Sequence, residues 1–90
     1  MAKDIDVDLD ELEKFIDVLR QFQDTTSDKL TAVKSAWATC DDSWEGSAKE
    51  KFTQEYTSTE EAVTKALEAG DDAIRWLEKF HEIVQEMEDS

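Results

Sequence analysis

Residues 52–87 read FTQEYTSTEEAVTKALEAGDDAIRWLEKFHEIVQEM, and nonpolar or small side chains recur in this stretch at alternating intervals of four and three residues. That spacing places them along one face of an α-helix. The chain has no proline, so no proline interrupts the helix. A capping box of Ser47 and Glu50 lies just before the stretch. The sequence therefore predicts one long helix over about residues 47–87.

A second periodic segment precedes this one, running from Leu12 to Cys40 with the same three-and-four spacing. Asp8 is a candidate N-cap because its carboxylate can accept the free amide of Glu11. Residues 41–46, which read DDSWEG, interrupt the pattern and predict a reversal. We therefore expect one all-α domain over residues 1–90, an antiparallel two-helix hairpin with a first helix over about 9–40, a turn at 41–46 and a second helix over about 47–87.

Folding the chain back at the turn sets large residues of the first helix opposite small ones of the second. Gly70 costs about 1 kcal/mol relative to alanine inside a helix, so we expect a close approach there. The expected hairpin seam consists of Leu12, Phe15, Leu19, Phe22, Val33, Phe52, Tyr56, Val63, Ala66, Gly70, Ala73, Leu77, Phe80 and Val84.

Both helices carry more nonpolar surface than one neighbouring helix can cover. The nonpolar residues beside the expected seam form a candidate partner interface: Ile16, Leu30, Trp37, Leu67, Ile74, Trp76 and Ile83. Pairing of two hairpins into a four-helix bundle would bury them. The alternative is that these side chains fold over their own hairpin.

The charge balance excludes several classes of function. With 24 acidic and ten basic residues the net charge is −14, which opposes binding to nucleic acids and to anionic membranes. The chain has one histidine and one cysteine and no glycine-rich phosphate loop, so we expect no enzyme and no cofactor. Glu78 and His81 have a spacing seen in metal-binding bundles, but neither is on the expected seam, so we expect no metal.

The turn carries the tripeptide Trp44-Glu45-Gly46, followed by Ala48 and Phe52 in the pattern W-x-G-x-A-x-x-x-F. In the middle of a two-helix chain of this length, this pattern resembles the WXG (Trp-X-Gly) family, the early-secreted-antigen-like hairpins of type VII secretion systems. Trp44 and Gly46 are the residues that carry the resemblance. The alternative is an unrelated cytoplasmic helical adaptor with an accidental W-E-G turn.

The resemblance implies a secretion substrate, or a targeting or chaperone-like partner of an exported effector, that acts by helical dimerisation. It implies a homodimer, or a heterodimer with another WXG-like hairpin or with the helical N-terminal domain of an exported toxin. It also implies contact with the secretion machinery and export from the cytoplasm without a cleavable signal peptide. Many members carry a C-terminal Tyr-x-x-x-Asp/Glu export signal, which residues 80–90 lack, so we expect a partner to supply it.

Overall fold

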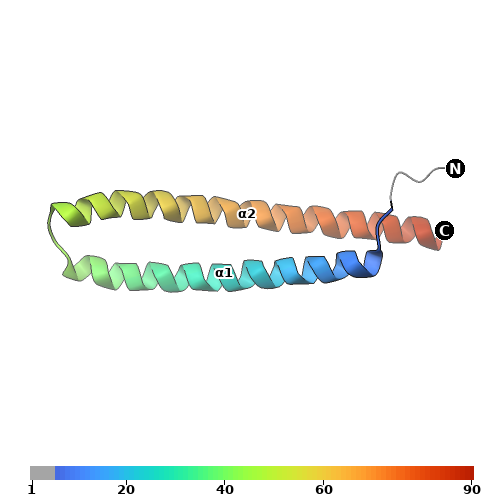
Figure 1. Ribbon diagram of the computed structural model, residues 1–90, viewed down its shortest axis with the longest axis horizontal. Coiled ribbons are helices and arrows are strands. Elements are labelled where there is room, and N and C mark those ends of the chain that lie inside the picture. Colours follow the sequence, from blue (N-terminus) through green and yellow to red (C-terminus); the bar gives the residue numbers. More distant parts are fainter. Residues whose placement is uncertain (1–5) are drawn as a thin grey trace.

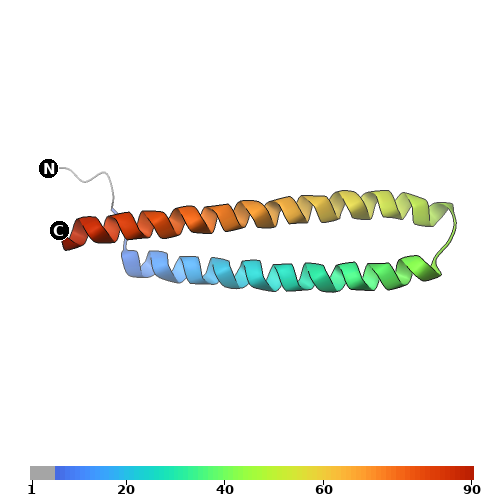
Figure 2. The same ribbon diagram turned by 180° about the vertical axis from the view of Figure 1, so that it is seen from behind.

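The computed structural model describes residues 6–90 and consists of two long antiparallel helices, α1 (Leu9–Ser43) and α2 (Ser47–Asp89) (Figure 1). The expected all-α hairpin is thereby confirmed. The view from behind shows the same two-rod arrangement, with the chain reversing once and the end of α2 lying beside the start of α1 (Figure 2). Residues 1–5, which the sequence assigns to the same domain, lie outside the described part.

α1 begins where Asp8 caps its free backbone amides. The Asp8 Oδ1 atom accepts hydrogen bonds from the amides of Asp10 at 2.9 Å and Glu11 at 3.1 Å. At the other end, α1 continues past Cys40 to Ser43, whose hydroxyl donates to the Cys40 carbonyl. Lys49 of α2 lies 2.9 Å from the Asp41 carboxylate. This ion pair links the last turn of α1 to the first turn of α2.

The reversal is therefore short, and Gly46 makes it possible. Gly46 has φ +116°, and it is the only positive φ among residues 6–90. A side chain resists this conformation, whereas glycine adopts it at little cost. The expected Ser47–Glu50 capping box is wrong, because α2 already includes Ser47 and its N-cap is Gly46, which has no side chain to donate or accept.

The best-packed region is the end of the hairpin where the chain termini lie. Ile16, Leu12 and Ile74 form its core, with Leu19 and Leu77 packed against them. Because two helices cannot enclose a large interior, these few residues carry much of the burial that holds the hairpin closed. α2 passes through Gly70 without a break, as the sequence predicts. No helix within residues 6–90 has a nonpolar stretch long enough to cross a membrane.

Candidate partner interface

The seam between α1 and α2 is rotated by about one residue from the seam expected from the sequence. Ile16 and Ile74, which the sequence assigns to a partner interface, are buried, with only 4% and 7% of their surface exposed. Phe15 and Phe22, which it assigns to the seam, are 53% and 60% exposed.

The remaining expected residues divide in the same way. Of the candidate partner residues, Leu30, Trp37 and Leu67 are half-buried in the hairpin, and Trp76 and Ile83 are exposed. Of the expected seam residues, exposure is found at Val33, Phe52, Ala66 and Ala73. Burial or half-burial is found at Leu12, Leu19, Tyr56, Val63, Gly70, Leu77, Phe80 and Val84.

A polar contact lies on this seam in the middle of the hairpin. Gln23 is buried, with 8% of its surface exposed. Its Nε2 atom donates hydrogen bonds to the Leu67 carbonyl at 2.7 Å and to the Asp71 carboxylate at 3.1 Å. The side chain lies against Gly70, where an added Cβ would be 2.4 Å from the Gln23 Oε1 atom. The close approach at Gly70 is therefore made by a glutamine side chain rather than by the first helix as a whole.

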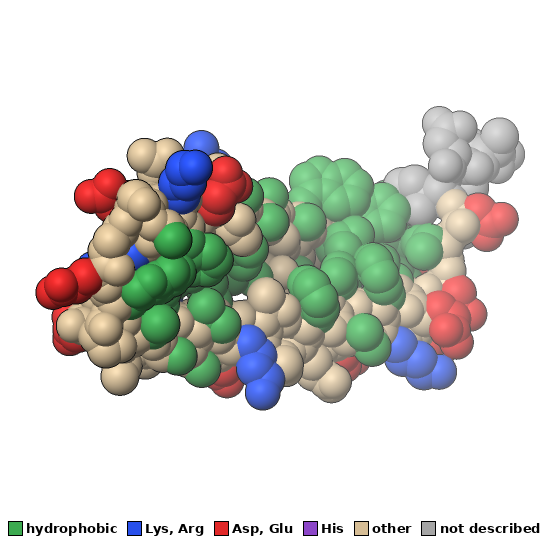
Figure 3. All heavy atoms as spheres, turned by 60° about the vertical axis from the view of Figure 1, so that its left-hand side comes forward, with side chains coloured by type: hydrophobic (Ala, Val, Ile, Leu, Met, Phe, Trp, Pro, Cys, Tyr) green, Lys and Arg blue, Asp and Glu red, His purple; other side chains and the backbone are tan. Residues whose placement is uncertain are grey.

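Most of the exposed large nonpolar side chains in the described residues follow a simple rule, and Val33 and Met87 lie outside it. Phe15, Val18 and Phe22 each directly precede a seam residue of α1, and the same offset recurs in α2. Residues one position before the seam lie on the same side of the hairpin in both helices. This follows because α2 runs in the opposite direction to α1 and also turns its seam toward α1, and the two reversals together leave that side unchanged. We call this set the apolar face: Phe15, Val18, Phe22, Phe52, Trp76 and Ile83. Figure 3 shows nonpolar side chains gathered on both helices, at the turn and again toward the termini.

The apolar face is uneven along its length. Near the termini, the rings of Trp76 and Phe80 stack with their centroids 5.4 Å apart and their planes 7° apart. In the middle of α2 the corresponding positions are the exposed alanines Ala66 and Ala73. The apolar face therefore has bulky side chains near the termini and small ones in the middle.

The opposite face of the hairpin is charged. Many residues that directly follow seam positions are acidic or basic, and Arg20 of α1 pairs with Glu78 of α2 across this face. Arg20 also lies 3.3 Å from Asp17 within α1. These pairs are exposed and individually contribute little to stability.

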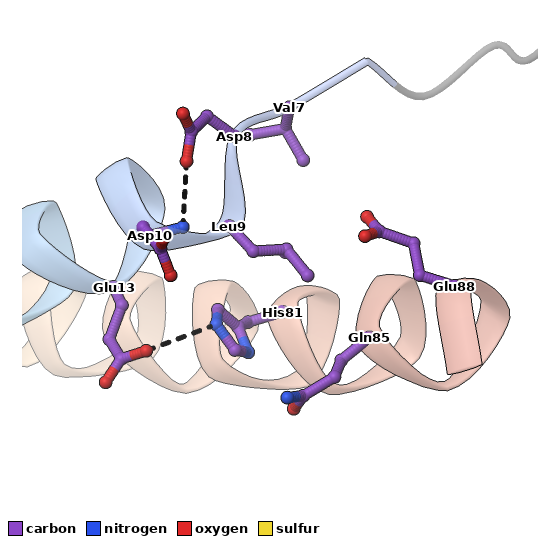
Figure 4. A pocket seen from close by; sticks show the side chains of 8 residues that line it. All are labelled: Val7, Asp8, Leu9, Asp10, Glu13, His81, Gln85 and Glu88. Atoms are coloured by element: carbon purple, nitrogen blue, oxygen red, sulfur yellow. Dashed lines mark hydrogen bonds and ion pairs between the residues drawn. The ribbon is translucent and has the colours of Figure 1, made fainter.

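A shallow hollow lies near the termini on the charged side (Figure 4). His81 points from α2 toward Glu13 of α1, with 3.8 Å between its Nε2 atom and the carboxylate, while Leu9 turns toward α2. Val7 and several acidic and amide side chains line the rest. Within residues 6–90 no group of three or more His, Cys, Asp or Glu residues is arranged to hold a metal ion.

At the turn, aromatic rings close the end of the hairpin. Trp37 of α1 lies 5.2 Å from Phe52 and 5.1 Å from Tyr56 of α2, measured between ring centroids. Trp44 packs edge-on against Trp37 at 6.3 Å and lies 5.9 Å from Phe52. The motif tryptophan therefore belongs to a cluster that joins both helices to the turn, and such ring pairs contribute beyond their buried area.

Tyr56 is the one group in this cluster whose titration is perturbed. Burial of its hydroxyl raises the pKa of Tyr56 above its ordinary value of 10.0, and the neighbouring Glu60 carboxylate raises it further. Both causes disfavour the charged tyrosinate. Glu60 in turn lies 3.6 Å from Lys34 of α1.

Sequence reasoning missed Val18, Gln23 and the rule that relates the two faces. A signal was present: acidic residues such as Asp17, Asp24 and Glu78 cluster on one side of each periodic row. The row of residues that directly precedes these charges could have been recognised as the seam. Exposed charges lie along one side of the contact between α1 and α2, and the apolar face lies along the other side.

Comparison with known proteins gives one match. A family model described as proteins of 100 residues with WXG matches residues 4–89, nearly the whole chain. No curated protein and no solved structure matches.

Proposed function

Because the chain belongs to the WXG100 family of small helical proteins secreted by type VII systems, we propose that it is an exported substrate or the targeting, chaperone-like partner of an exported effector. Family membership over residues 4–89 rules out the alternative of an unrelated adaptor with an accidental W-E-G turn. Members of the family work with secretion machinery and are not generally enzymes. The function of this chain therefore rests on what its surface binds.

The observation that carries the proposal is the one-sided distribution of exposed nonpolar residues. The apolar face presents Trp76 at 64% exposed, together with Phe15 and Phe22, while the opposite face is charged and paired across the helices. A monomeric protein rarely leaves large nonpolar side chains gathered on one face uncovered. We propose that a second helical hairpin covers it and completes a four-helix bundle.

The net charge of −14 does not oppose such pairing as strongly as its size suggests. Acidic residues such as Asp17, Asp71 and Glu78 follow seam positions and therefore lie on the face away from the partner. In a bundle joined through the apolar faces, these charges would point outward into solvent, where salt screens them beyond about 10 Å. The proposed partner is a second copy of this chain, another WXG-like hairpin or the helical N-terminal domain of an exported toxin.

We further propose that the chain is made in the cytoplasm and exported as a folded bundle without a cleavable signal peptide. The closed aromatic turn supports this proposal, since Trp44 is packed against Trp37 and Phe52 and so keeps the end of the rod ordered. Trp44 is only half-buried, so part of its surface is available to the secretion machinery.

Export is tested by following the tagged chain in culture medium from cells with and without an active type VII ATPase. We expect the chain in the medium only when the ATPase is active. A Trp76→Ala variant should remain folded in the cell but appear in the medium in a smaller amount, because its pairing is weakened. Equal amounts of chain in the medium with and without the ATPase would contradict the proposal.

A further inference from the structure

Each helix carries two nonpolar rows, one residue apart, and nonpolar content alone does not decide which row lies inside. The inner row contains Ile16 and Ile74, and the outer row contains Phe15, Phe22 and Trp76. Turning each helix by about 100° would exchange the rows. Hydrophobic burial has no preferred direction, so a directional contact is needed to select one arrangement.

Gln23 makes that contact at the middle of the hairpin. Its amide donates two hydrogen bonds to α2, to the Leu67 carbonyl at 2.7 Å and to Asp71 at 3.1 Å. The side chain fits because residue 70 is glycine: a Cβ there would lie 2.4 Å from Oε1 and 2.6 Å from Cδ and Nε2. Gln23 is also the only buried polar residue within residues 6–90.

Exchanging the rows would turn Phe22 toward α2 and carry Gln23 out to solvent. Both hydrogen bonds would be lost, and the space beside Gly70 would lose the amide that fills it. A single buried polar residue in a helical pair commonly fixes register and orientation at some cost in stability.

The geometry points to Gln23, seated against Gly70, as the positioning residue that keeps the aromatic row outside and so determines which face the partner meets. This inference rests on the proposed role of the apolar face in pairing. It assigns Gln23 no contact with the partner itself. Its effect on pairing passes through the rotation of α1 against α2.

The test replaces Gln23 with methionine, which has a similar length and shape but no hydrogen-bond donor. Gln21→Met is the matched control, because Gln21 is exposed in the same helix. Both changes are made in a background carrying Trp37→Phe and Trp44→Phe, so that Trp76 is the only tryptophan. Acrylamide quenching of Trp76 in dilute protein then reports its exposure, and sedimentation of concentrated protein reports pairing.

For Gln23→Met we expect unchanged helix content and weaker quenching of Trp76, because the aromatic row turns inward. The dissociation constant for pairing should rise about tenfold, and Gln21→Met should match the parent in all three measurements. Gly70→Ala provides a second test, since alanine favours helix but displaces the Gln23 amide. It should change quenching in the same direction.

Unchanged quenching in both Gln23→Met and Gly70→Ala would overturn the inference. Lower thermal stability without a change in quenching would show a merely structural role and overturn it equally. If the parent chain does not pair with any hairpin, the proposed function fails, but the quenching comparison still decides whether Gln23 sets the exposed row.

Discussion

Replacing Trp76 with alanine should weaken pairing while leaving the hairpin folded. Trp76 is 64% exposed and stacks on Phe80, so it contributes little to the contact between α1 and α2. A tryptophan side chain presents about 200 Å². Covering the exposed part would bury about 130 Å², worth about 3 kcal/mol at 25 cal/mol per Å². The dissociation constant of the bundle should therefore rise by about a hundredfold for each hairpin that carries the substitution.

The assay is sedimentation equilibrium over a range of concentrations, with circular dichroism at the same concentrations to follow helix content. Glu68→Ala is the matched control, because Glu68 lies on the charged face of the same helix and is also changed to alanine. We expect its dissociation constant to equal that of the unchanged chain. If Trp76→Ala and Glu68→Ala pair equally well, the apolar face is not the interface. Loss of helix in dilute Trp76→Ala would also refute the reasoning, since it would make Trp76 part of the fold.

Three further predictions concern the fold. Ile74→Ala should lower the free energy of unfolding in urea by about 2–3 kcal/mol, because Ile74 is buried against Leu12 and Ile16; a loss below about 1 kcal/mol would contradict the seam described above. Gly46→Ala should lower it by about 1–2 kcal/mol, because φ +116° is unfavourable for a side chain, and an unchanged urea midpoint would be inconsistent with this turn. The raised pKa of Tyr56 predicts a tyrosinate absorbance midpoint above pH 10 and a contribution of Tyr56 to the free energy of unfolding that is constant below pH 10 and falls as pH rises beyond it. Tyr56→Phe should remove that fall, and an identical pH profile in the variant would exclude Tyr56 as its cause.

The sequence predicted the hairpin because its signals were local and consistent. The three-and-four spacing, the absence of proline and the Asp8 cap indicate long helices, and the glycine at position 46 indicates where the chain reverses. Each of these signals depends on neighbouring residues only. The extension of α1 to Ser43 was not predicted, because it accompanies an ion pair between Asp41 and Lys49 that forms only after the chain has folded back.

The candidate interface was harder to predict because it depends on how the two helices are rotated. Phe15 and Ile16 are adjacent and both nonpolar, so periodicity could not tell which of them lies inside. Gln23 appeared as a polar interruption in the true seam and favoured the neighbouring row through Phe22. Only the paired helices show that Gly70 accommodates the Gln23 side chain and that α2 supplies its acceptors.

The central claim, that the apolar face is covered by a second hairpin, is tested most directly by the mass of the native complex. The chain is purified without denaturant from the cells that make it, and light scattering gives its mass at low and at high salt. We predict at least two hairpins per particle at both salt concentrations, since acidic residues such as Asp17, Asp71 and Glu78 lie away from the apolar face. A lone chain of 10.3 kDa at both salt concentrations would contradict the account.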